Sequence, residues 1–402
     1  MESNNRMIKI LKLLVIAIFA QIYITSALFK QIDWFTPTFG IVLIICFLIH
    51  LRGSVEMPNR VFPFFVYFLF ALLSGIVFSE YRDEIIPYII EYLENIVFLY
   101  ILYYISKEDI EFCPRVLAGI SFFSCVISLT RNFTVHGRLA LHQEAGINRL
   151  AFLLCMGVIS SIILLSHKRR KLEVLYYTVM IIIELYTMTI IGARKYFLVS
   201  CLSLAIWMIV CLRQVLENRG YAYSTALYFA LIILIMMIGY RLLPIFYQSS
   251  VYARLSGEID RTASDTTRLE LYRDGLKILG DYPLFGMGYN SFYLHYGVTS
   301  HSTYTELWTG TGIIGTIIYL TSIGMIIYDH LCMYVDCLDK RVEIKTNIII
   351  LLSLLILGAG IALQYESLFY FILAYLICFS EKRVNEDTTQ IIEKRSKYVK
   401  YS

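Results

Sequence analysis

Three arginines have the chemistry needed to hold a leaving group that carries concentrated negative charge. Arg194 and Arg268 are the first candidates, and Arg138 is the third. A guanidinium can form bidentate hydrogen bonds with phosphate oxygens, and fixed cations accelerate the departure of a pyrophosphate by stabilising the charge that develops in the transition state. Arginines near a membrane surface also bind lipid phosphates or helix carbonyls, so a structural role stays open for each of them.

His301 is the residue best suited to proton transfer, because histidine ionises near neutral pH and can accept the proton of a hydroxyl group. Such catalysis typically contributes roughly 100- to 10,000-fold to a rate. A histidine here could also cap a helix or form a hydrogen bond at the membrane interface. We predict that His301, Arg268 and Arg194 are the catalytic residues, with His136 and His295 as weaker alternatives to His301.

Three carboxylates lie inside long apolar segments. Glu91 and Glu94 are spaced to share one face of a helix, and Glu184 is near the middle of another segment. An ionisable group in lipid costs a few kcal/mol or more, so each should face protein or water. They could bind hydroxyl groups of a substrate, carry protons or pair with a polar group on a neighbouring helix.

Other polar residues are expected to contact a substrate. Glu366 begins the last apolar segment and is better placed than the three membrane carboxylates to contact a substrate. The substrate-binding candidates are Arg138, Asn148, Arg273, Glu306 and Glu366.

Two pairs of glycines are interpreted as structural. Gly286 and Gly288 lack the preceding strand and the third glycine of a dinucleotide-binding loop, so they predict a tight turn with positive φ. Gly312 and Gly315 are expected to let helices approach closely.

The elements that must position these residues are membrane-spanning helices. The chain of 402 residues is 58% hydrophobic and 16% charged, with a mean hydropathy of +0.66, which excludes an ordinary water-soluble domain. About 20 apolar residues are needed to cross a bilayer, and roughly twelve such stretches are present. They are 8–29, 35–51, 61–78, 85–105, 111–129, 148–166, 172–191, 195–212, 222–243, 302–328, 347–363 and 366–380. The first lacks a small-residue cleavage site and is expected to be retained.

Basic residues predict the orientation of these spans. An even number of spans puts both termini on one side, and most of the 35 Lys and Arg residues, including the run at 168–171 and the tail at 381–402, fall on that side. We therefore expect a single polytopic membrane domain over 1–402 in a bacterial cytoplasmic membrane, with both termini and the tail cytoplasmic.

Composition also argues against several partners. A net charge of +4 scattered over loops does not predict nucleic-acid binding. The nine cysteines lie in spans or in loops expected to be cytoplasmic, so disulfides are not expected. Cys332 and Cys337 lack the further ligands of a zinc site, and we predict no metal and no cofactor.

The longest segment outside the predicted spans is an exterior loop at 244–301, where we expect the chemistry. In it, Thr267 to Glu270 has the pattern of a capping box, and Leu269, Tyr272, Leu276 and Leu279 recur at helical spacing. The pattern predicts a short amphipathic helix at 268–279 on the outer membrane face, with Arg268 in its first turn, where backbone N–H groups favour an anion.

Ordered motifs over roughly 138–315 resemble those of the O-antigen ligase and Wzy-type polysaccharide polymerase superfamily. They are Arg138, NRLA at 148–151, GAR at 192–194, Arg268, DYPLFGMG at 281–288, HSTY at 301–304 and GIIG at 312–315. Two departures are Ser302, where the family usually has Asn after the His, and Gly310-Thr311, where it often has an acidic residue before the Gly-x-x-Gly.

The resemblance implies an all-α integral membrane glycosyltransferase with a GT-C-like fold and one large exterior loop. It implies transfer of a glycan from an undecaprenyl-pyrophosphate carrier to an acceptor sugar without a metal or nucleotide, and a possible partner that regulates chain length. We favour a polymerase of capsule, exopolysaccharide or O-antigen. The alternatives are a ligase that makes a single transfer, and a transporter or flippase of a lipid-linked glycan, which would place more ionisable residues at the membrane midplane.

Overall fold

The computed structural model describes residues 2–25, 35–51, 58–131, 134–135, 138–139, 147–167, 169–217, 262–336 and 341–381. These residues form an all-α integral membrane protein, with one two-residue antiparallel pair, β1 (Thr134–Val135) and β2 (Arg138–Leu139). Among them, seven helices are long and apolar enough to cross a membrane, and three shorter apolar helices accompany these. The expected fold class is confirmed.

Helices occur at every predicted span except 222–243, which lies outside the described residues. They are α1 (Glu2–Phe19) with its continuation η1 (Ala20–Thr25), α3 (Phe35–Leu51), α4 (Phe62–Phe78), α5 (Arg82–Glu108), α6 (Phe112–Arg131), α7 (Ile147–Ser166), α8 (Lys171–Ile191), α9 (Arg194–Glu217), α14 (Thr303–Asp336), α15 (Arg341–Gly358) and the helix Ser367–Glu381. The other helices of the described part are α12 (Thr262–Asp281) and the short α13 (Ser291–Tyr296) and η2 (Leu363–Tyr365).

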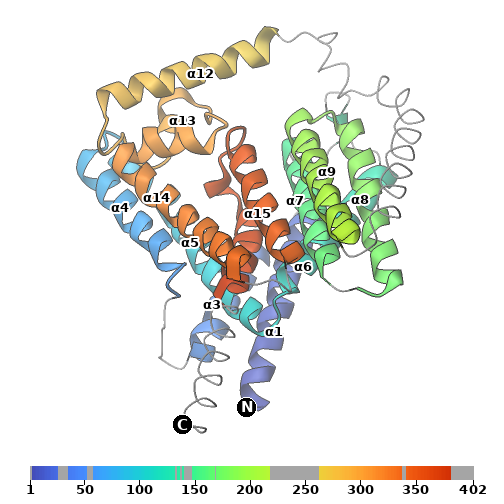
Figure 1. Cartoon of the computed structure of the whole chain (residues 1–402). Helices are drawn as coiled ribbons and strands as arrows, with labels where there is room; N and C mark the ends of the chain where they lie inside the picture. Colours follow the sequence, from blue (N-terminus) through green and yellow to red (C-terminus); the bar gives the residue numbers. More distant parts are fainter. Residues whose placement is uncertain are drawn as a thin grey trace, which may run out of the picture.

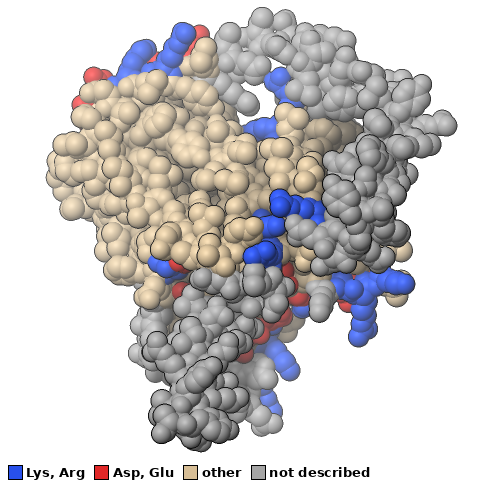
Figure 2. All heavy atoms as spheres, in the orientation of Figure 1, with Lys and Arg blue, Asp and Glu red and all other residues tan. Residues whose placement is uncertain are grey.

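The spanning helices form a bundle with two distinct ends (Figure 1). Helix α12 crosses one end, which we call the α12 end, with α13 below it, and α1 starts at the opposite end. In Figure 2 charged side chains gather along α12 and on the lower part of the molecule, while the surface between them on the left is a broad uncharged area. That distribution is typical of a protein whose middle band contacts lipid.

Two helices with apolar residues on all sides occupy the centre of the bundle. Nearly all side chains of α7 from Leu150 to Leu164 are buried, and those from Leu368 to Ser380 in the helix Ser367–Glu381 are buried as well. A helix that is hydrophobic all round is favoured in such an interior position. Both helices begin at the α12 end.

Helix α14 is broken by a glycine near its start. Gly312 has φ 64° and ψ −166°, a conformation that other residues rarely adopt. The backbone carbonyls of Thr309 and Gly310 accept hydrogen bonds of 2.8 Å and 2.9 Å from the N–H groups of Met287 and Gly288. The turn at 286–288 thus provides hydrogen-bond donors for two carbonyls that the break leaves without helical partners. Backbone polar groups inside a membrane must be hydrogen-bonded within the protein.

The predicted turn at 286–288 is confirmed, since Gly286 and Gly288 have φ of 71° and 108°. The prediction that Gly312 lets two helices approach closely was wrong, because this glycine instead permits a break in the backbone of α14. A Cβ on Gly312 would lie 2.3 Å from the Leu284 carbonyl oxygen. Gly315 does permit close packing, because a Cβ there would approach Phe70 of α4 to 3.0 Å.

The amphipathic helix is present but differs from the prediction in extent and buried face. Helix α12 begins at Thr262, so Thr267 is not its cap and Arg268 lies beyond its first turn. The prediction that free N–H groups at the start of this helix help Arg268 to bind an anion is therefore wrong. Leu269 and Leu276 are exposed, whereas the face that packs inward carries Leu271 and Ile278.

The buried face of α12 also carries Gly275, and a Cβ at this position would lie 2.5 Å from Thr305 Cγ2. The absence of a side chain lets α12 rest directly on the first turns of α14. The buried face was missed because Leu271, Gly275 and Ile278 form a stripe with a glycine in the middle, which periodicity in leucines does not reveal.

Candidate functional site

The predicted site residues that the structure describes all come from segments at the α12 end. Arg194 is the first residue of α9 and Asn148 the second of α7, where it is exposed. Arg273 is an exposed residue of α12. Arg138 lies in β2 and Arg268 in α12, but the side chains of both are outside the described part of the structure.

His301 lies in the short loop before α14 with a strained backbone. Its φ of 56° is unusual for a residue other than glycine. Its Nδ1 lies 3.4 Å from Thr299 Oγ1, a hydrogen bond whose direction depends on the histidine tautomer. The side chain is half-buried. An outlier of this kind at a candidate proton acceptor is consistent with a functional constraint.

Glu306 is buried and is hydrogen-bonded to the backbone of this loop. Only 3% of the residue is exposed, its Oε1 accepts a 2.6 Å hydrogen bond from the Ser300 N–H, and its Oε2 accepts one of 3.3 Å from Tyr365 Oη. Tyr365 directly precedes Glu366. Glu306 is therefore hydrogen-bonded to the residue that precedes Glu366 in the chain.

Sequence reasoning missed two basic residues near Glu366. The Arg149 guanidinium lies over the Tyr23 ring at 5.3 Å, and Lys195 Nζ lies 4.7 Å from the Tyr196 ring and donates a hydrogen bond to the Gly360 carbonyl. Both residues begin spanning helices, α7 and α9, and each follows directly after a residue that was predicted instead, Asn148 and Arg194. The motifs pointed to these two helix starts, but they did not indicate the contacts that Arg149 and Lys195 make there.

Glu366 has an unusual electrostatic environment just before the helix that begins at Ser367. Burial raises the pKa of its carboxyl above the usual range, Arg149 and Lys195 act to lower it, and the Glu91 carboxylate acts to raise it. The carboxyl group therefore shares its surroundings with two cations and one anion from three other helices. Such a mixture of charges can bind both a phosphate and sugar hydroxyls.

The carboxylates inside the spans have different surroundings. Glu184 is fully buried, and its Oε1 accepts a 2.6 Å hydrogen bond from Ser121 Oγ on α6. This contact fits the structural interpretation, in which the carboxylate pairs with a polar group of a neighbouring helix. Glu91 and Glu94 are exposed on α5.

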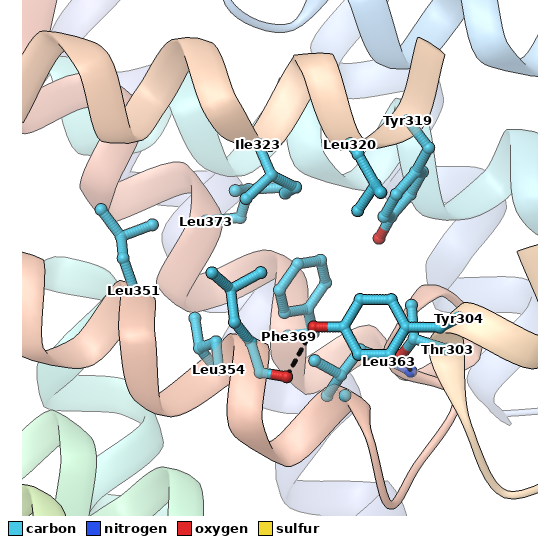
Figure 3. Close-up of a pocket in the computed structure, with 12 residues that line it drawn as sticks. Thr303, Tyr304, Tyr319, Leu320, Ile323, Leu351, Leu354, Leu363, Phe369 and Leu373 are labelled. Atoms are coloured by element: carbon cyan, nitrogen blue, oxygen red, sulfur yellow. Dashed lines mark hydrogen bonds between the residues drawn. The ribbon is translucent and has the colours of Figure 1, made fainter. Parts of the chain in front are cut away.

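An apolar pocket lies between α14, α15 and the helix Ser367–Glu381 (Figure 3). Leu320 and Ile323 of α14 face Leu351 and Leu354 of α15 across it. Tyr304 lies at one end, where its Oη donates a 2.7 Å hydrogen bond to the Leu355 carbonyl. Thr303 also lines the pocket, and it is two residues from His301. The lining of the pocket is mainly apolar, so it offers little to a sugar.

Comparison with known families decides how this end of the bundle is interpreted. Residues 179–320 match the family model described as O-antigen ligase. The matched segment runs from α8 into α14 and contains Arg194, Arg268 and His301, which confirms the resemblance inferred from the motifs. It ends before Glu366 and begins after Asn148. None of the curated proteins compared matches the chain.

The family match indicates a glycosyltransferase-like membrane enzyme of cell-surface glycan processing, of the O-antigen ligase or polymerase kind. The described helices agree with this, since they form a multi-pass membrane protein. Families of this kind act on lipid-linked glycans, and the α12 end offers both charged groups and an apolar pocket beside them.

Proposed function

We propose that this protein is a polysaccharide polymerase that transfers a glycan from an undecaprenyl-pyrophosphate carrier to an acceptor sugar. The observation that supports it most is the match to the O-antigen ligase family over the segment that contains Arg194, Arg268 and His301. The acceptor would be a lipid-linked glycan of a capsule, exopolysaccharide or O-antigen. The α12 end would face the exterior of a bacterial cytoplasmic membrane, with both termini in the cytoplasm.

The transfer is an inverting substitution at the anomeric carbon of the donor sugar. An acceptor hydroxyl oxygen forms the new bond to this carbon, the bond from the carbon to the phosphate oxygen breaks, and the pyrophosphate leaves on its lipid. His301 accepts the hydroxyl proton. Arg194, Arg268 and Arg138 stabilise the negative charge that builds up on the leaving pyrophosphate, so neither a metal nor a cofactor is required.

Further residues of the α12 end would hold the two glycans. Asn148, Arg273 and Glu366 are candidates for contacts to sugars, and Arg149 and Lys195 add positive charge beside Glu366. The carrier tail would enter sideways between helices and occupy the pocket lined by α14 and α15. This arrangement keeps the lipid in the membrane while the sugars remain in water. A separate protein that regulates chain length is a possible partner.

A ligase that makes one transfer to a lipid or protein acceptor is the second candidate. The specific observation in its favour is the description of the matching family, which is that of O-antigen ligases. The two activities share the donor chemistry and differ only in whether the product becomes an acceptor again.

The deciding experiment uses purified protein in liposomes with the carrier-linked repeat unit of the host, and separates the glycan products on a gel. We expect a ladder of regular steps from the wild type and from Lys277→Ala, an exposed position of α12, but no ladder from Arg268→Ala or His301→Ala. A single added step, seen only with another acceptor, would support the ligase. An unchanged repeat unit that is moved across the bilayer would contradict both enzymes.

A further inference from the structure

The loop that carries His301 is fixed by its own neighbours. Ser300 Oγ and the backbone of Ser302 form two hydrogen bonds, of 3.2 Å and 3.3 Å. Ser302 Oγ in turn accepts the Thr305 N–H at 3.3 Å, as a residue capping α14 does. These bonds hold the chain on both sides of His301, but all of them are short-range and none reaches another helix.

Glu306 provides the link to the rest of the protein. Its first oxygen accepts the Ser300 N–H at 2.6 Å, which fixes the peptide that joins Thr299 to Ser300, one residue before His301. Its second oxygen accepts the hydroxyl of Tyr365, which belongs to the segment between α15 and the last helix. Because Glu306 is 3% exposed and both of its oxygens have protein donors, it has no open side for a sugar.

The partner segment is itself well anchored. Thr303 N and Thr303 Oγ1 both donate hydrogen bonds to the Ile361 carbonyl, at 3.0 Å and 2.7 Å, and Leu363 N donates to Thr303 Oγ1 at 2.9 Å. The ring of Tyr365 packs edge-on against Tyr289 with 5.3 Å between centroids. Because these contacts fix the segment, the hydrogen bond from Tyr365 also fixes the position of the Glu306 carboxylate.

We infer that Glu306 is a positioning residue, which holds His301 in its left-handed conformation and sets its place relative to Glu366. This replaces the expectation that Glu306 binds substrate. The inference rests on the proposed function only in giving His301 a chemical role. A misplacement of about 1 Å can cost roughly 100-fold in rate, so a bond that fixes the backbone of the residue next to His301 is enough to matter.

The first test follows the loop itself and needs no substrate. Amide hydrogen exchange is measured on peptides that cover 296–303, with the full chain in lipid nanodiscs. Glu306→Ala should speed exchange at Ser300 by about tenfold or more, because its N–H loses a buried acceptor. Glu306→Gln should leave exchange near the wild-type rate, since an amide oxygen can accept the same N–H. Glu184→Gln, which alters another buried carboxyl, should have no effect on these peptides.

The second test measures transfer with carrier-linked oligosaccharide extracted from the host. Glu306→Ala should lower kcat by about 10- to 100-fold with little change in KM, and Glu306→Gln should restore most of it. Tyr365→Phe, which leaves the Ser300 bond intact, should give an intermediate loss. In a His301→Ala background the Glu306→Ala change should cost little more, because the positioned group is already absent.

Two results would overturn the inference. One is unchanged exchange at Ser300 in Glu306→Ala. The other is a rise in KM with unchanged kcat, which is expected of a residue that binds substrate directly. If His301→Ala keeps full activity while Glu306→Ala still loosens the loop, the proposed role of His301 fails and the positioning role is reduced to holding the loop. The two failures are thus distinguishable.

Discussion

The residue after His301 differs from the usual residue of the family that the motifs resemble, and its contacts suggest what it does in this chain. Ser302 Oγ accepts the Thr305 N–H three residues into α14. Asparagine and serine are about equally good at capping the start of a helix. An asparagine at this position is therefore expected to cap α14 as Ser302 does, so we interpret the difference as bearing on the helix rather than on proton transfer.

This interpretation predicts the effect of two substitutions. Ser302→Ala should lower the stability of the protein by about 1 kcal/mol, because a helix N–H loses its acceptor, while Ser302→Asn should stay within a few tenths. Thermal unfolding in a single detergent measures both. Equal losses for the two variants would show that the small size of the buried serine matters and that capping does not.

The environment of Glu366 makes a prediction about pH. If its ionised carboxylate receives hydrogen bonds from a sugar, transfer falls as the pH drops through its pKa. Burial raises that pKa, so the loss begins at a higher pH than it would for an exposed glutamate. Arg149→Gln removes a group that lowers the pKa and should move the acid limb to higher pH. Glu91→Gln removes a group that raises it and should move the limb to lower pH.

Initial rates of transfer across the acidic range, measured with saturating donor, check these opposite shifts. Lys277→Gln serves as the control for loss of a distant positive charge at the same end of the bundle. Shifts of the same sign in Arg149→Gln and Glu91→Gln would mean that a different group controls the acid limb.

At the scale of elements, the contact between α12 and α14 depends on one missing side chain. A Cβ on Gly275 would lie 2.5 Å from Thr305 Cγ2 and 3.3 Å from Trp308 Nε1. Gly275→Ala should therefore destabilise the packing of α12 by about 1 to 3 kcal/mol. Transfer should fall with it, because the same turns of α14 carry Glu306.

Two further variants make this prediction specific. Thr305→Ser removes the methyl group that the new Cβ would meet, so it should rescue Gly275→Ala in both stability and activity. Gly280→Ala adds a methyl group to the same helix where no atom lies within 4 Å, and it should be harmless. Equal effects of the two alanine variants would mean that helix propensity, and not the contact, decides the outcome.

The sequence predicts regular elements better than their interruptions. Span limits follow from long apolar runs, and the turn at Gly286 and Gly288 from residue type alone. The break at Gly312 could not be predicted, because its partner is a turn more than twenty residues earlier in the chain, which supplies the N–H groups of Met287 and Gly288. The start of α12 was placed too late, since the capping pattern at Thr267 occurs inside a helix.

In the candidate site, too, local patterns predicted the segments, whereas contacts between distant segments could not be predicted. The motifs led to the prediction of Asn148 and Arg194 as site residues. The basic residues that lower the pKa of Glu366 are instead their neighbours Arg149 and Lys195. Likewise, Glu306 was expected to face substrate, and only the contact with Tyr365 shows that it is enclosed by protein. Both differences arise from packing between distant segments, to which a single sequence gives no access.

For the whole molecule, charge gathers at the end opposite α12 in ordered networks. Lys12 pairs with Asp109 at 2.9 Å, and Arg169 pairs with Glu111 at 2.7 Å. At the same end, the side chain of Arg60 donates two hydrogen bonds of 2.6 Å to Asp329. These pairs join α1, α6 and α14 to other parts of the bundle. Because Lys and Arg favour the cytoplasmic side, we predict that this end faces the cytoplasm and that α12 and the candidate site face the exterior.

This orientation can be tested in intact cells with a membrane-impermeant maleimide. Lys277→Cys adds a thiol on α12, where the native side chain is 73% exposed, and Lys171→Cys adds one at the exposed start of α8 at the opposite end. The first variant should react at once and the second only after the membrane is permeabilised, with the wild type as the blank for native cysteines. The reverse pattern would put the α12 end in the cytoplasm, and a site there could not join glycans on the exterior face. The proposed polymerase would then have to be abandoned, although the family match and the geometry of His301 would stand.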